Sequence, residues 1–265
     1  MKKYLAYYEN EWPANIAELT AVENWPFVGY LEGEGVSYTV IPEKVVSGPW
    51  VTFTAEEDNS SIGLTKLSTN QTLEYSTDTT TWNTFDTTTN ISLNSGDKVY
   101  VRGVLSADNT SKNYTQFKMS GKIAASGNCN ALWNYQDLNA PLKTYCGNYM
   151  FYNCTNLTTA PELPATTLAN SCYSYMFNNC TSLTTAPELP ATTLAQSCYR
   201  YMFYGCSNLN YIKCLATNIS ASMCTNNWVN GVASTGTFVK HPNMNNWPTS
   251  TSGIPGGWTV EDAVL

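Results

Sequence analysis

Residues 154–177 read CTNLTTAPELPATTLANSCYSYMF, and residues 180–203 read CTSLTTAPELPATTLAQSCYRYMF, the same stretch displaced by 26 residues. Only three of the 24 aligned positions differ: Asn156/Ser182, Asn170/Gln196 and Ser174/Arg200. A fixed period between about 20 and 50 residues is the signature of stacked supersecondary units. The repeat therefore predicts a solenoid, in which each unit buries its apolar side chains against its neighbours.

Each unit combines an extended segment, Leu-Thr-Thr-Ala-Pro-Glu-Leu, with a tight return, Cys-Tyr-x-Tyr-Met-Phe-x-x-Cys. The prolines exclude a long helix across the unit. The repeat continues in weaker form on both sides, in residues 128–151 and in residues 205–228. Two near-identical inner units between two degenerate outer units are the pattern of a capped solenoid.

The motif Phe-x-x-Cys-[Thr/Ser]-[Asn/Ser]-Leu, followed by Leu-Pro and a second cysteine, resembles the BspA-like leucine-rich repeat in a 26-residue form. The resemblance covers about residues 128–230, which is under half of the chain. It implies adhesion and surface display, and it carries no catalytic residues and no cofactor. Such repeats recur in surface proteins of gut bacteria and in head or tail fibres of their crAss-like phages.

The composition narrows the class of protein. The formal net charge is −7, and charged residues make up 12% of the chain, against about a quarter in typical soluble domains. The acidic balance and the lack of a basic patch argue against a nucleic-acid partner. No window approaches the roughly 18 apolar residues of a membrane span. Residues 1–12 are too polar for a signal peptide, so we expect a protein made in the host cytoplasm that leaves it in a virion.

The fold class is expected to be mainly β, in four parts. Residues 1–44 are aromatic-rich and too few for a core of their own, which favours an N-terminal docking arm. The alternative is that they pack on the following domain. The arm's candidate docking residues are Tyr4, Tyr7, Tyr8, Trp12, Trp25 and Phe27. Within it, we expect a short helix opening at Pro13 and a hairpin that pairs residues 27–31 with residues 36–41.

Residues 45–126 contain short β-branched and aromatic runs separated by turn signals, at 50–55, 61–66, 72–76, 82–85, 90–93, 98–104 and 116–124. This spacing predicts an immunoglobulin-like β-sandwich. Residues 127–230 form the leucine-rich-repeat solenoid, and residues 231–265 form a C-terminal β cap. Phe238 and Trp258 are expected to cover the last coil, because an open strand edge recruits other chains.

The nine cysteines fall mostly on the repeat, and none forms a Cys-x-x-Cys pair. No metal site is therefore expected. Stacked side chains point in parallel, whereas disulfides need facing ones. We expect buried, free thiols that act as small hydrophobic residues.

No catalytic residues are assigned. The single histidine, His241, would have to carry any Ser-His-Asp or Cys-His arrangement alone. Glu162 and Glu188 are one coil apart, which suggests roughly the 5 Å carboxyl separation of retaining glycosidases. Their identical sequence contexts, however, would not push their pKa values apart as acid and nucleophile roles require. An enzyme is therefore a distant alternative.

The candidate ligand-binding residues are Tyr173, Tyr175, Tyr199, Arg200 and Tyr201. Aromatic rows beside polar residues suit sugar rings, and an arginine suits an acidic sugar or a protein carboxylate. The alternative is that one tyrosine of each Tyr-x-Tyr pair packs inside the solenoid. Positions that differ between the inner units, such as 170/196 and 174/200, are expected to face solvent because interiors tolerate little change.

These features favour a structural virion protein, a head-fibre or similar appendage subunit. It would dock on other virion proteins by its N-terminus, form a homo-oligomer and display a repeat domain that binds a bacterial surface glycan or protein. The alternative is a bacterial leucine-rich-repeat adhesin, and the distant alternative is a carbohydrate-active enzyme of a tail fibre.

Overall fold

The computed structural model describes residues 3–6, 27–31 and 48–265, the first two ranges as backbone only. The chain divides into two compact units, Met1–Gly48 and Pro49–Leu265. In the first unit, β1 (Lys3–Ala6) pairs antiparallel with β2 (Phe27–Leu31). The strand at 27–31 is thus confirmed, and its partner in the structure is β1. The partner expected from sequence, residues 36–41, and the helix at Pro13 lie outside the described residues.

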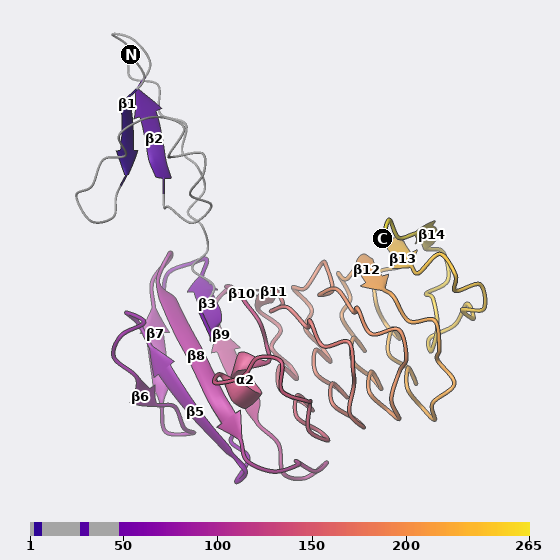
Figure 1. Ribbon diagram of the computed structural model, residues 1–265, viewed down its shortest axis with the longest axis horizontal. Coiled ribbons are helices and arrows are strands. Elements are labelled where there is room, and N and C mark those ends of the chain that lie inside the picture. The colour runs from indigo at the N-terminus through magenta and orange to yellow at the C-terminus, as the bar shows by residue number, and fades with distance from the viewer. Residues whose placement is uncertain (1–2, 7–26, 32–47) are drawn as a thin grey trace. The chain divides into compact units, whose positions relative to one another are not determined.

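The second unit begins with two antiparallel sheets (Figure 1). Their strands are β3 (Val51–Ala55), β4 (Ser60–Lys66), β5 (Gln71–Ser76), β6 (Asn83–Thr84), β7 (Asn90–Leu93), β8 (Lys98–Leu105), β9 (Gln116–Ser120) and β10 (Ile123–Ser126). The orders are β10-β3-β8-β5-β6 and β7-β4-β9. The expected strands all appear, except that the run 116–124 turns at Gly121 and divides into β9 and β10, which belong to different sheets.

The strand order agrees with the immunoglobulin order at its centre and departs from it at its edges. The pairs β4·β7 and β5·β8 correspond to the central B·E and C·F pairs of that fold. However, the first strand, β3, pairs with β8, and β9 pairs with β4. In the immunoglobulin order the first strand flanks the second, and the last flanks the penultimate. In this arrangement one edge of β10 pairs with β3. The other edge of β10 pairs in parallel with β11 (Leu157–Thr159), in the first coil of the repeat.

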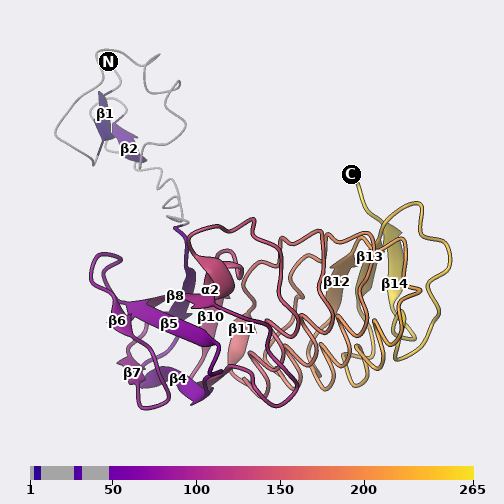
Figure 2. The same ribbon diagram turned by 60° about the horizontal axis from the view of Figure 1, so that its bottom comes forward.

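After the short helix α2 (Ala131–Asn134), the chain winds into stacked coils, which Figures 1 and 2 show side by side. Backbone hydrogen bonds join residues 25 apart: the N–H of Tyr149 donates to the carbonyl of Ser174 (3.1 Å), and that of Tyr175 to Arg200 (2.9 Å). The N–H groups between them donate to carbonyls three residues back in the same coil. Half of the donors in each return therefore close turns, and the other half bind the next coil.

These turns require a left-handed backbone conformation at every fourth residue. It occurs at Tyr145, Tyr149, Asn153, Ser171, Tyr175, Asn179, Ser197, Tyr201, Gly205, Met223, Asn227 and Gly231. For a residue other than glycine this conformation costs on the order of 1 kcal/mol, which the hydrogen bonds between coils must offset. At Gly205 (φ 74°) a Cβ atom would lie 2.1 Å from Oδ1 of Asn179, so a larger residue there would have to displace that side chain.

One hydrophobic core runs through the sandwich and the coils. Phe151, Phe177 and Phe203 stack at centroid distances of 5.4 and 5.8 Å, with ring planes within 6°. Phe117 of β9 continues this row at 5.2 Å from Phe151. The sandwich therefore serves as the N-terminal cap of the repeat, although the sequence places the two in separate segments.

The C-terminal end of the stack is a parallel sheet of β12 (Tyr211–Cys214), β13 (Thr237–Lys240) and β14 (Thr259–Asp262). Phe238 and Trp258 are buried there, as the sequence predicts. Trp228 and Trp247, stacked at 5.7 Å, complete the end of the core. The cap does not cover the sheet edge: β14 is exposed along its length, and its carboxylates discourage pairing with other chains.

Among the described residues, no helix is long and apolar enough to cross a membrane.

All nine cysteines are buried and free, which confirms the sequence prediction. Several of the thiols are turned toward neighbouring backbone: Sγ of Cys180 lies 3.1 Å from the carbonyl oxygen of Phe151, and Sγ of Cys206 lies 3.0 Å from that of Phe177. Burial raises the pKa of Cys154, Cys206 and Cys214 to about 12. The thiolate, which is the reactive form, is thus suppressed in the folded protein.

The first prediction is a loss of stability at alkaline pH. Below about pH 8.5, the ordinary pKa of a thiol, the cysteines hold their protons in both the folded and the unfolded chain. Above it, the unfolded chain releases protons that the folded chain keeps, so the free energy of unfolding falls as pH rises. Each fully buried thiol contributes up to about 1.4 kcal/mol per pH unit.

Urea unfolding between about pH 7 and about pH 10 measures this effect. In parallel, iodoacetamide should label few thiols in the native protein and all nine in the denatured one. A denaturation midpoint that stays constant over this range, or rapid native labelling, would contradict the burial of the thiols.

Candidate functional site

The two tyrosines of each Tyr-x-Tyr return have opposite environments. Tyr173 and Tyr199 are each 1% exposed, and their rings stack at 6.2 Å inside the core. Tyr175 and Tyr201 are partly exposed on the outside of the coils. Burial raises the pKa of Tyr173 and Tyr199 well above the ordinary tyrosine value. These two candidate ligand residues are therefore core residues, out of reach of a ligand at the surface.

The outer tyrosines form a continuous stack, the tyrosine row, made of Tyr114, Tyr149, Tyr175 and Tyr201. Successive ring centroids are 4.8, 4.6 and 4.8 Å apart. Tyr114 comes from the loop before β9, so the row crosses from the sandwich to the coils. Sequence reasoning missed Tyr114, because no repeat motif links that loop to the returns.

This geometry changes what the row can recognise. Sugars stack on open aromatic faces, but here each ring covers the face of the next. Lys66 Nζ lies 4.0 Å from the centroid of Tyr114 at one end, and Arg200 Cζ lies 5.3 Å from that of Tyr201 near the other. The row therefore presents ring edges and hydroxyl groups. Burial, with the neighbouring tyrosines, raises the pKa of Tyr149 to about 12, so its hydroxyl keeps its proton at neutral pH.

Arg200 is the charged group at the Tyr201 end of the row. Within the described residues its guanidinium makes no ion pair, and its Nε is buried without a hydrogen-bond partner. The preceding coil has Ser174 at this position, and its hydroxyl donates to the carbonyl of Arg200 (3.2 Å).

The expectation that variable positions face solvent is confirmed for Asn170 and Gln196, which are exposed. Arg200 is partly buried. The expectation is wrong for Ser174, which is 4% exposed. A small serine fits beneath the next coil, whereas the arginine side chain places its guanidinium 5.3 Å from the ring centroid of Tyr201.

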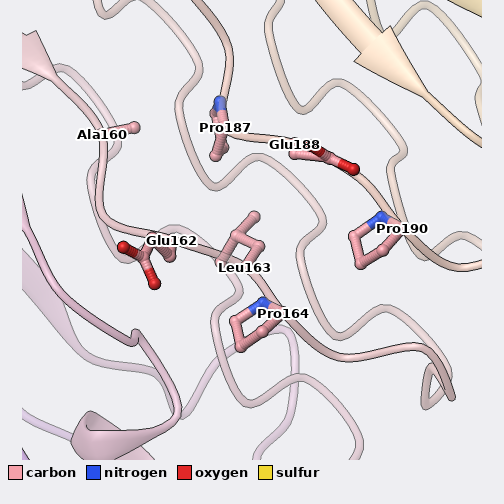
Figure 3. Close-up of a pocket in the computed structure, with 7 residues that line it drawn as sticks. All are labelled: Ala160, Glu162, Leu163, Pro164, Pro187, Glu188 and Pro190. Atoms are coloured by element: carbon pink, nitrogen blue, oxygen red, sulfur yellow. The ribbon is translucent and has the colours of Figure 1, made fainter. Parts of the chain in front are cut away.

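A second feature lies between two extended segments, where seven residues line a pocket of about 360 Å³: Ala160, Glu162, Leu163, Pro164, Pro187, Glu188 and Pro190 (Figure 3). The carboxylates of Glu162 and Glu188 point away from each other in this view. Glu188 is paired with Lys213 at 3.0 Å. The structure thus does not bring these acids together as the facing pair that a retaining glycosidase needs.

The other sequence candidates are placed as follows. Tyr4 lies on β1 and Phe27 on β2, whereas Tyr7, Tyr8, Trp12 and Trp25 lie outside the described residues. His241 accepts a hydrogen bond at Nδ1 from the backbone N–H of Asn243 (3.1 Å). In the part of the chain that the structure describes, no three His, Cys, Asp or Glu side chains are grouped to hold a metal ion.

The regular coils and the stacked rings are the geometry of a leucine-rich repeat. Residues 128–238 match the family model of the BspA type leucine-rich repeat region, in six copies. The match confirms the resemblance seen in the motifs and extends it to β13. The sandwich and the first unit lie outside it. Neither a curated protein nor a solved structure matches the chain.

The second prediction concerns the tyrosine row. Tyr175→Ala removes two stacked contacts from its middle and should lower the free energy of unfolding by about 1–3 kcal/mol, since an aromatic pair contributes about 0.5–1.5 kcal/mol. Tyr175→Phe keeps the ring and should change it by less than about 0.5 kcal/mol. Urea unfolding measures both, with Tyr204→Ala as the control, because Tyr204 packs only on the edge of the row. Equal effects of Tyr175→Ala and Tyr175→Phe would show that stacking does not hold the row together.

Proposed function

We propose that this chain is a structural subunit of a phage virion appendage, of the head-fibre kind, which binds and displays rather than catalyses. Its unit Met1–Gly48 docks on other virion proteins, and its unit Pro49–Leu265 is presented outward. The division of the chain into two compact units supports this arrangement, because the second has a continuous core of its own. Assembly as a homo-oligomer belongs to the same proposal.

The observation that carries the proposal is the set of nine buried, free cysteines. Disulfides form in oxidising compartments, and free thiols persist in the reducing cytoplasm. A virion subunit folds and assembles in the cytoplasm of its host, whereas a secreted adhesin passes through a more oxidising compartment.

The alternative, a bacterial surface adhesin, is favoured by the BspA-type repeats and would use the same outer face of the coils.

The recognition face in this proposal is the tyrosine row with Arg200. Hydroxyl groups at a regular spacing offer donors and acceptors to a polar ligand. The unpaired guanidinium adds a charge-assisted donor that fits a carboxylate, either of an acidic sugar or of a protein. The two together favour an acidic bacterial surface polysaccharide, recognised by hydrogen bonds along the ring edges.

The third prediction tests docking. A chain that lacks residues 1–48 should remain folded, because the core of the second unit begins at Val51. It should be absent from purified virions in a phage that encodes only the truncated form, whereas the full chain is present. Mass spectrometry of the virions and circular dichroism of the isolated proteins measure the two outcomes. Incorporation of the truncated chain, or its unfolding, would contradict the docking role of the first unit.

The fourth prediction tests recognition. Arg200→Ser installs the residue of the preceding coil and should change the free energy of unfolding by less than about 1 kcal/mol. It should weaken attachment to host cells or to their immobilised polysaccharide by about tenfold, the effect of losing one charge-assisted hydrogen bond. The matched control is Gln196→Asn, which also copies the preceding coil, at an exposed position. Unchanged attachment of Arg200→Ser would exclude this face and leave display as the function.

A further inference from the structure

In the described part of the chain, the extended segments of successive coils are joined by backbone hydrogen bonds except at one place, between residues 160–168 and residues 184–194, which we call the seam. On one side of the seam, Glu162 exchanges backbone hydrogen bonds with Gly127 and Cys129, both at 2.9 Å. On the other side, Ala186 donates to Tyr211 (2.9 Å) and Leu189 to Lys213 (3.0 Å). Within the described residues, no backbone hydrogen bond joins residues 160–168 to residues 184–194.

The cause lies in the repeated Ala-Pro-Glu-Leu-Pro segment. Each copy carries two prolines, which have no N–H to donate to a neighbouring strand. Where two such copies face each other, at 160–164 and 186–190, the ladder between coils is interrupted. Between the other pairs of neighbouring extended segments, at least one segment has fewer prolines, and backbone hydrogen bonds join the two coils.

The pocket of about 360 Å³ opens at this seam. Proline rings, Ala160 and Leu163 supply its apolar wall, and the two glutamates stand at its rim (Figure 3). Sites for small ligands commonly measure about 300–1,000 Å³. This pocket is at the low end of that range, a size suited to one long side chain of a partner.

Along this side of the coils, the carboxylate of Glu162 is left without a cationic partner in the described residues. Glu188 is paired with Lys213 of the next coil, and Lys240 is paired with Asp262 further on. The Glu162 side chain, which is exposed, has no hydrogen bond or ion pair in the described part of the chain. An apolar wall with a free carboxylate at its rim is complementary to a group that is cationic at its tip and apolar along its stem.

We propose that this pocket binds an arginine side chain of a protein partner. The guanidinium pairs with Glu162 in a bidentate arrangement, and its aliphatic stem packs on Leu163 and Pro164. Arginine fits better than lysine, because a guanidinium is planar, more weakly hydrated and able to lie against apolar surface while it bonds a carboxylate. This site is separate from the tyrosine row and does not depend on the virion assignment.

The probe for the test is acetyl-arginine-N-methylamide, titrated into the full-length protein with methyl-labelled leucine. The methyl resonances of Leu163 should shift and saturate, with an affinity in the millimolar range expected for so small a ligand. Glu162→Gln should weaken binding about tenfold. The matched control, Glu188→Gln, should weaken it less than about twofold, because Lys213 already engages that carboxylate.

Two further probes make the inference specific. Acetyl-lysine-N-methylamide should bind more weakly than the arginine compound, and acetyl-norleucine-N-methylamide should not bind measurably. Equal binding of the arginine and norleucine compounds would reduce the pocket to a simple apolar site and overturn the proposal. Equal binding of the lysine compound would overturn the choice of arginine. The absence of any shift at Leu163 would overturn the site as a whole, while leaving the tests of Arg200 and of residues 1–48 unaffected.

Discussion

The structure depends on the hydrogen bonds that join each return to the next coil, between residues 25 apart. They hold equivalent positions of successive coils one above another, so that each residue type forms a row. Phenylalanines stack on phenylalanines and inner tyrosines on inner tyrosines, with ring planes within 6°. Because alternate N–H groups close turns within the coil, the returns satisfy their donors without forming a helix. The left-handed residues at every fourth position are the conformational cost of this arrangement.

A stack of identical coils has two open ends, and this protein closes them differently. At the first end β10 pairs with β11, and Phe117 stacks on Phe151, so a folded sandwich replaces the missing neighbour. At the last end tryptophans cover the core, while β14 remains an exposed edge with carboxylates along it. Repeat units contact only their neighbours, so covered ends are needed for a soluble stack. The shared core explains why residues 49–265 behave as one unit.

Regular stacking also determines where recognition can arise. Most buried positions must suit the coil above and the coil below, whereas positions 170/196 and 174/200 differ between coils, although Ser174 is itself buried. Arg200 stands where the previous coil has serine, and Lys213 stands on the glutamate side of the coils beside Glu188. Arg200 and Lys213 each alter the charge of the surface and leave the stacked aromatic rows of the core unchanged. The two proposed sites, at Arg200 and at Glu162, both arise from such breaks in the repetition.

The sequence alone determined the period, the capped stack, the strands of residues 45–126 and the burial of the cysteines, because these follow from local composition and from matches along one chain. It could not decide which tyrosine of a Tyr-x-Tyr pair lies inside, because the motif carries no local signal that distinguishes the two tyrosines. In the structure Tyr173 packs in the core, whereas Tyr175, at the left-handed position of the turn, lies outside. The pairing of β3 with β8, the place of Tyr114 in the row and the isolation of Glu162 depend on residues distant in the chain. Only the tertiary structure decided them, because partners across sheets and coils are selected by packing and not by local pattern.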